Sequence, residues 1–182
     1  YTLLLMPAAD AVQPAVRRKL PYDLERDFTP VSRIVFGPWF LIVHPSVPAR
    51  NAREFVALAR ASPGKLNYAS SGVGSSAQMV SELVNSLANV KITHVPYRGA
   101  PPLVQDLIGG HIDLANSTLP SVIAQIKDGQ LRGLALGSPK RNPQLPDLPT
   151  LEEQGIKGAN AASWTGFFAP AATPKSAIER LS

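Results

Sequence analysis

From Asn51 to Leu136, helix and strand signals alternate along the chain at the spacing that is typical of βαβ units. Strands joined by such helical crossovers are parallel, and the crossovers are right-handed. Short apolar runs predict strands at 66–69, 92–95, 112–115 and 131–136, and periodic apolar positions predict helices at 77–87 and about 103–108. The alternation therefore predicts an α/β fold built on a parallel sheet.

Capping signals mark where further helices begin. Asn51, with Glu54 three residues later, is a candidate capping box at the start of one helix. The same motif at 150–155 (TLEEQG) predicts a short helix there. Thr118 or Ser117 is expected to cap a helix that has a proline in its first turn.

Two longer strand-like segments, 36–43 and 162–169, flank the regular region and can carry the chain between two lobes. Another strand is expected at 1–5, followed by a loop, MPAADA. Because the chain opens inside a strand without an initiator methionine, we expect a fragment of a longer protein. The expected parts, in chain order, are a partial first lobe with a crossing strand (1–40), a second α/β ligand-binding lobe (41–161), and a return strand with the start of a first-lobe helix (162–182).

The segment NYASSGVGSSAQMVSELV combines a buried strand, a Gly/Ser loop at 70–76 and a helix. Gly72 and Gly74 allow positive φ and a close approach of the main chain to a ligand. Ser75 and Ser76 bring hydroxyl and N–H groups to a helix N-terminus, where anions are favoured. The segment predicts a site for a carboxylate or phosphate, although a capped strand-to-helix connection without a ligand explains the same residues.

Composition excludes several classes of function. The net charge is +5, but Lys and Arg are dispersed and not interleaved with aromatic residues, which disfavours nucleic acid. Because the chain has no cysteine, it can form neither disulfides nor thiolate metal sites. No apolar run is long enough to cross a membrane, no cofactor is expected, and no metal-ligand spacing is found among the three histidines, His44, His94 and His111.

A series of motifs resembles the substrate-binding proteins of tripartite tricarboxylate transporters, the Bug family of periplasmic receptors. The motifs are YTLL, LPYDLERDFTPVSRI, HPSVPARNAREFVALARASPGKLNYASSGVGSS, HVPYRGAPPLVQDLIGGHIDLANSTLPS, IKDGQLRGLALGSPKRNPQLPDLPTLEEQG and SWTGFFAPAATPKSAIERL. The resemblance implies a type II periplasmic-binding-protein-like fold, with one nearly complete three-layer α/β/α lobe and a partial second lobe. It also implies a non-enzymatic receptor that carries a small organic anion, a di- or tricarboxylate or a related acid, to a membrane permease.

By this resemblance a ligand carboxylate is held by main-chain N–H groups and hydroxyls of one loop from each lobe. The implied second-lobe contacts are Ser70, Ser71, Gly72, Gly74, Ser75 and Ser76. The PYRG segment and a turn at NST are implied to add side walls, namely Tyr97, Arg98, Asn116, Ser117 and Thr118. Ala9 and Asp10 stand where relatives carry the polar first-lobe loop, and they depart from that pattern. Family members that hold an amino group can place an Asp at the position of Ser117, so we expect a carboxylate without an essential amino group.

Three other expectations stay open from the sequence. A serine hydrolase would need His94 or His111 within reach of Ser75, although the chain has no G-x-S-x-G motif. A sensory or regulatory ligand-binding domain would need an attached output domain. The uncovered strands at 1–5 or 36–43 could also pair two copies of the fragment in a dimer or strand swap.

Overall fold

The computed structural model describes residues 2–16 and 19–182. The chain divides into two compact units, one made of Tyr1–Gly37 with Ser163–Ser182 and the other of Pro38–Ala162. A long strand, β2 (Phe28–Val43), contributes its first part to the former unit and its last part to the latter. The assignment of these units to the two lobes of a receptor stays a prediction.

The unit Pro38–Ala162 contains a five-stranded sheet in the order β6–β2–β5–β3–β4. Its strands after β2 are β3 (Asn67–Ser70), β4 (Thr93–Pro96), β5 (Leu114–Thr118) and β6 (Arg132–Leu136). β3 pairs in parallel with both β4 and β5, whereas β2 runs antiparallel to β5 and β6. The predicted parallel sheet is therefore confirmed, with one antiparallel strand inserted in it.

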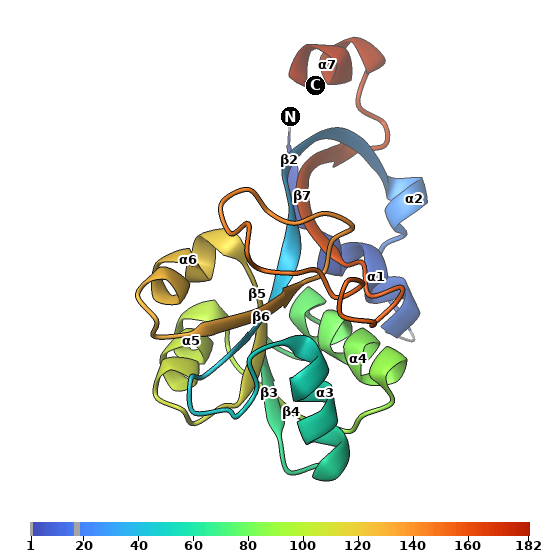
Figure 1. Ribbon diagram of the computed structural model, residues 1–182. Helices are drawn as coiled ribbons and strands as arrows, with labels where there is room; N and C mark the ends of the chain where they lie inside the picture. The colour runs from blue at the N-terminus through green and yellow to red at the C-terminus, as the bar shows by residue number, and fades with distance from the viewer. Residues whose placement is uncertain (1, 17–18) are drawn as a thin grey trace. The chain divides into compact units, whose positions relative to one another are not determined.

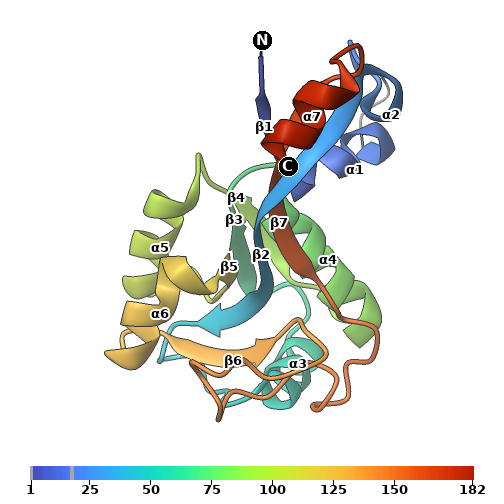
Figure 2. The same cartoon turned by 90° about the horizontal axis from the view of Figure 1, so that it is seen from above.

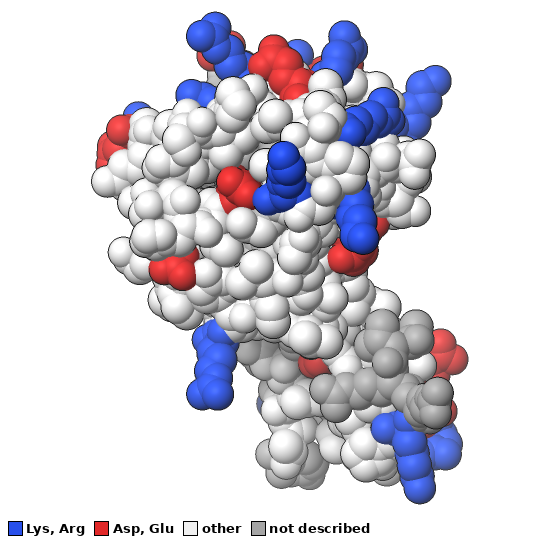
Figure 3. All heavy atoms as spheres, turned by 90° about the horizontal axis from the view of Figure 1, so that it is seen from below, with Lys and Arg blue, Asp and Glu red and all other residues white. Residues whose placement is uncertain are grey.

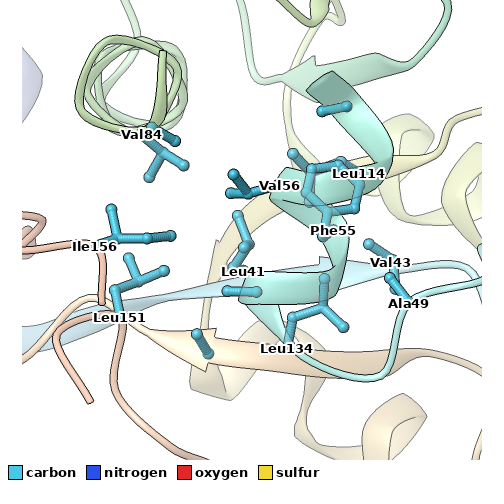
Figure 4. Packing of buried hydrophobic residues seen from close by; sticks show 14 of the residues in the cluster. Leu41, Val43, Ala49, Phe55, Val56, Val84, Leu114, Leu134, Leu151 and Ile156 are labelled. Carbon is cyan, nitrogen blue, oxygen red and sulfur yellow. The ribbon is translucent and has the colours of Figure 1, made fainter. Parts of the chain in front are cut away.

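Helices cover both faces of this sheet (Figures 1 and 2). α3 (Ala52–Ala61) and α4 (Ser76–Ala88) lie on one face, and α5 (Ala100–Ile108) and α6 (Leu119–Lys127) lie on the other. The alternation along β2 sends Leu41 to the α3/α4 side and Phe40 to the α5/α6 side. In Figure 4, Leu41 and Leu134 from the sheet lie with Phe55 of α3 in the first of these two cores. The predicted three-layer arrangement is confirmed.

The N-terminus of α3 is capped both locally and from a distant segment. The Asn51 side chain accepts the N–H of Glu54 at 2.9 Å, so this predicted N-cap is confirmed. The buried side-chain oxygen of Gln154 accepts the N–H groups of Ala52 and Arg53 at 2.5 and 3.3 Å, and its amide donates to the carbonyl of Leu134. One glutamine thus ties α3 to β6 and the turn at 151–155.

In its described residues, the other unit contains β1, part of β2 and β7, with three short helices. Their bounds are β1 (Leu4–Pro7), α1 (Ala8–Val16), α2 (Leu24–Asp27), β7 (Ala162–Pro170) and α7 (Lys175–Leu181). β1 pairs antiparallel with β7, and β7 lies beside β2. The strand predicted at 1–5 begins only at Leu4, and Tyr1 lies outside the described residues. The prediction of a loop at MPAADA is wrong, because Pro7 ends β1 and Ala9 and Asp10 belong to the first turn of α1. Alanine favours helix, and an acidic residue stabilises the helix N-terminus.

Three more predictions from the sequence need correction. β2 extends eight residues further toward the N-terminus than 36–43, because Pro30 lies at its beginning and does not interrupt the ladder within the sheet of the Pro38–Ala162 unit. Thr150 and Glu153 do form a capping box, but residues 151–155 form turns and not a helix. Gly155, with φ of 90°, leaves the helical region after one turn and so prevents a helix from continuing. Finally, Phe40–Val43 are paired on both sides, by β5 and β6, so this part of 36–43 offers no open edge for a strand swap.

Candidate functional site

Three strand ends of the Pro38–Ala162 unit meet along one edge of its sheet. β3, β4 and β5 run in the same direction and end at Ser70, Pro96 and Thr118. Each is followed, directly or after a short loop, by the N-terminus of α4, α5 or α6. Three helix N-termini, each with partial positive charge, therefore border this edge, which is where open α/β sheets bind ligands.

The Gly/Ser loop between β3 and α4 has the backbone that the sequence predicted. Gly72 and Gly74 have φ of 132° and 79°, a region that side chains rarely adopt. A Cβ at Gly72 would lie 3.6 Å from the carbonyl oxygen of Tyr97, so the PYRG segment after β4 lies close against this loop. Two of the predicted site segments are thus adjacent.

Ser75 caps α4, and Ser76 is the first residue of that helix and not part of the loop. The Ser75 hydroxyl accepts the N–H of Gln78 at 3.3 Å, and the Ser75 N–H is bonded to Gly72 at 3.2 Å. Within the described part of the chain, no acceptor is found for the N–H groups of Ser76 and Ala77. These two groups are the anion donors that the helix end offers.

The other two helix N-termini are poorer in donors. Pro101 and Pro102 remove two N–H groups from the first turn of α5, and Pro120 removes one from α6. α5 and α6 contribute their dipoles to the edge, but α4 carries the larger set of directed donors. Arg98 precedes Gly99, the N-cap of α5; it is exposed and has no ion pair within 2–16 and 19–182, so it can supply a full positive charge nearby.

The side chains of Ser70, Gln78 and His94 form a network that holds the Gly/Ser loop. His94 Nε2 lies 2.7 Å from Ser70 Oγ, and His94 Nδ1 lies 3.3 Å from Gln78 Nε2. Ser70 Oγ donates to the Gly72 carbonyl at 3.0 Å, and Gln78 Oε1 accepts the Gly74 N–H at 2.7 Å. Because Ser70 is fully buried and its hydroxyl is engaged, we expect it to support the loop rather than contact a ligand.

The NST segment forms the end of β5 and not a turn, because Asn116, Ser117 and Thr118 pair with β2. Asn116 is buried and donates to Ser81 of α4 at 2.8 Å, so it joins strand to helix. Ser117 is also buried. Thr118 is the N-cap residue of α6, as predicted, but its side chain makes no capping bond and lies 3.4 Å from the Ser121 hydroxyl.

Tyr97 is held at its hydroxyl, which donates to Asp106 at 2.6 Å. Burial and this hydrogen bond raise the pKa of Tyr97 to about 12. The ring is therefore a fixed, neutral wall beside the loop. Ala9 and Asp10 lie in the other unit, on α1, and their contact with a ligand stays a prediction.

The geometry argues against a serine nucleophile. Ser75, which the hydrolase hypothesis requires, bonds to the N–H of Gln78, and among the described residues no histidine is bonded to it. The histidine that does meet a serine meets buried Ser70, whose proton is directed to a carbonyl. Burial also lowers the pKa of His94 below its usual value, which weakens it as a base.

Two surface features bear on other functions. A groove of about 700 Å³ in the unit made of Tyr1–Gly37 and Ser163–Ser182 is lined mainly by apolar residues from the segment before β1, the end of β7, the loop after it and α7, with Arg180 as its charged member. On the face that Figure 3 shows, Lys and Arg stand apart and several lie beside an acid, without a continuous basic surface. None of the helices in the described ranges has the length and apolar character needed to cross a membrane.

Comparisons with known proteins agree with this geometry. A family model described as "Tripartite tricarboxylate transporter family receptor" matches residues 1–182. The chain is 37% identical over 183 residues to "UPF0065 protein in tcbD-tcbE intergenic region" of Pseudomonas sp. (strain P51), covering 100% of this chain and 54% of that protein. It spans about half the length of the curated relatives it matches. These comparisons do not support the predicted dimer or strand swap.

Two similar solved structures contain a carboxylate. One is Rpa4515 of R. palustris with adipate, at 36% identity and a TM-score of 0.83 over 90% of this chain and 55% of that one. The other is MatC from Rhodopseudomonas palustris with bound malate, at 29% identity and a TM-score of 0.89 over 98% of this chain and 61% of that one.

Proposed function

Because the chain belongs to the tripartite tricarboxylate transporter receptor family, as the motifs predicted, we propose that it is part of a periplasmic receptor for a small organic di- or tricarboxylate. One carboxylate of the ligand accepts hydrogen bonds from the main-chain N–H groups of Ser76 and Ala77 at the start of α4. The single observation that carries the proposal is this open pair of N–H groups, set at a sheet edge where three helix N-termini meet. Adipate and malate in similar receptors support the ligand class.

The receptor acts by binding and not by catalysis. The ligand's first carboxylate is held at the α4 loop, and the remainder contacts a second lobe, so that binding favours a closed form. A ligand shifts this equilibrium only by its greater affinity for the closed form, and both lobes must therefore contact it. The membrane permease then takes the ligand from the closed receptor.

A thermal-shift screen of the full-length protein tests this function. We expect one or more di- or tricarboxylates to raise the melting temperature, because a ligand at 100 times its Kd adds about 2.7 kcal/mol to the free energy of unfolding. Monocarboxylates of the same chain length are the matched controls and should act more weakly. No stabilisation by any organic acid, in a protein that melts cooperatively, would contradict the proposal.

Amino acids should bind more weakly than plain dicarboxylates. Ser117 is a neutral, buried residue at the position where an acid would be needed to pair with an ammonium group. A hydrogen bond to a charged group contributes about 1.5–3 kcal/mol, so its absence lowers affinity by about 10- to 100-fold. Calorimetric titration with succinate and aspartate, which differ by one amino group, measures the difference. Tighter binding of aspartate would overturn this specificity.

A further inference from the structure

We propose that His94, acting through Ser70 and Gln78, is a positioning residue that sets the shape of the anion-binding loop and makes ligand affinity depend on pH. The proposal rests on the proposed function of the α4 loop. Its structural basis is the network beneath the loop, in which His94 contacts side chains from both flanks of the Gly/Ser segment.

The hydrogen bonds assign one tautomer to His94. The Gly74 N–H requires an acceptor, so the Gln78 oxygen points to Gly74 and the Gln78 amide nitrogen points to His94. His94 Nδ1 must then be unprotonated and accept. Ser70 donates its only hydroxyl proton to the Gly72 carbonyl, so it accepts from His94 Nε2–H. Every donor in this chain of bonds thus meets an acceptor.

Protonation of His94 breaks this agreement. A proton on Nδ1 would face the amide nitrogen of Gln78, so that two donors oppose each other. Rotating the Gln78 amide would relieve this conflict, but it would take the acceptor away from the Gly74 N–H. Either outcome disturbs the turn that precedes Ser75 and the open N–H groups of α4.

The surroundings of His94 favour the neutral ring. Its imidazole stacks on Tyr68 at 4.8 Å between ring centroids, at an angle of 20°. Burial lowers the pKa of His94, while Glu82 opposes that shift; the Glu82 carboxylate accepts the Tyr68 hydroxyl at 2.5 Å. Tyr68 and Glu82 are the titratable groups on β3 and α4 that face the ring. Since the folded pKa of His94 lies below its ordinary value, the ring stays neutral to lower pH than a free imidazole does, and the penalty of protonation grows as the pH falls.

The test is the affinity of the full-length protein for adipate and malate, measured by calorimetry between about pH 5.5 and 7.5. His94→Phe keeps a ring against Tyr68 but removes both hydrogen bonds, and should weaken binding about 10-fold at neutral pH. His94→Gln restores a donor toward Ser70 and should recover part of that loss without the pH dependence. Comparison at equal pH cancels titration of the ligand itself. His111→Gln, at an exposed histidine, is the control and should match the unchanged protein.

A second measurement needs no ligand. The nitrogen and proton shifts of His94 report its tautomer, and the amide signals of Gly72 and Gly74 report the loop. We expect those glycine signals to titrate with the His94 ring and to stop doing so in His94→Gln. Glycine amides that do not follow the ring would overturn the positioning role even if carboxylates bind. A coupled loop in a protein that binds no carboxylate would instead reject the proposed function alone.

Discussion

Replacing Ser76 with proline should weaken carboxylate binding by about 10- to 100-fold and leave the fold intact, because it removes one charge-assisted hydrogen bond worth about 1.5–3 kcal/mol. Ser76 is the first residue of α4, a position where proline is well tolerated because its N–H makes no bond within the helix. The preceding Ser75 already has the extended backbone, φ −72° and ψ 154°, that a residue before proline requires. The variant therefore deletes a main-chain donor almost alone.

Ser76→Ala is the matched control for this variant. Alanine removes the hydroxyl and keeps the N–H, so its affinity for adipate or malate should change little. Calorimetric titration measures the affinity of each protein, and the melting temperature without ligand checks the fold. Equal losses in both variants would assign the contact to the hydroxyl. Unchanged affinity in Ser76→Pro would place the carboxylate away from α4.

Replacing Gln154 with leucine should lower the free energy of unfolding by about 2–4 kcal/mol, which is large for one side chain. The substitution leaves the N–H of Ala52 and the carbonyl of Leu134 without their partner in a buried site, and it also removes the longer, partly buried bond from the N–H of Arg53. Leucine has a similar volume, so the loss reports unsatisfied polar groups and not a cavity. In a protein of this size the melting temperature should fall by roughly 4–16 °C.

Gln130→Leu serves as the control, because Gln130 is exposed and has no side-chain hydrogen bond to any described residue. Its unfolding free energy should stay within about 0.5 kcal/mol of the unchanged protein. Chemical denaturation of all three proteins gives the comparison. A loss of less than about 1 kcal/mol for Gln154→Leu would mean that water or a rearranged turn replaces the glutamine.

Local chemistry predicted much of this structure from the sequence. The caps at Asn51 and Ser75, the positive φ of Gly72 and Gly74, and the alternation of strands and helices follow from neighbours in the chain. The distant capping of α3 by Gln154 does not, because it depends on residues about a hundred positions apart. No local signal distinguishes this glutamine from an exposed one.

The same limit applies to the site. The Ser/Gly pattern predicted the loop, but not which of its groups are free, since Ser70 and Ser75 are used within the fold. The role of His94 was missed as well, because its partners come from β3 and α4 and only the parallel register brings them together. Asn116, Ser117 and Thr118 were placed in a turn because their polar character hides a strand that pairs with β2.

The position of β2 has a consequence for how the chain folds as it is made. Phe40 of β2 pairs with Ser117 of β5 on one side and with Leu136 of β6 on the other. β2 therefore cannot form its full set of strand pairs until both of these later strands have been synthesised. Contacts between distant segments form slowly, and the sheet cannot be completed until β6 exists. A chain with this order of assembly can complete its central sheet only late in synthesis, after Leu136 has been added.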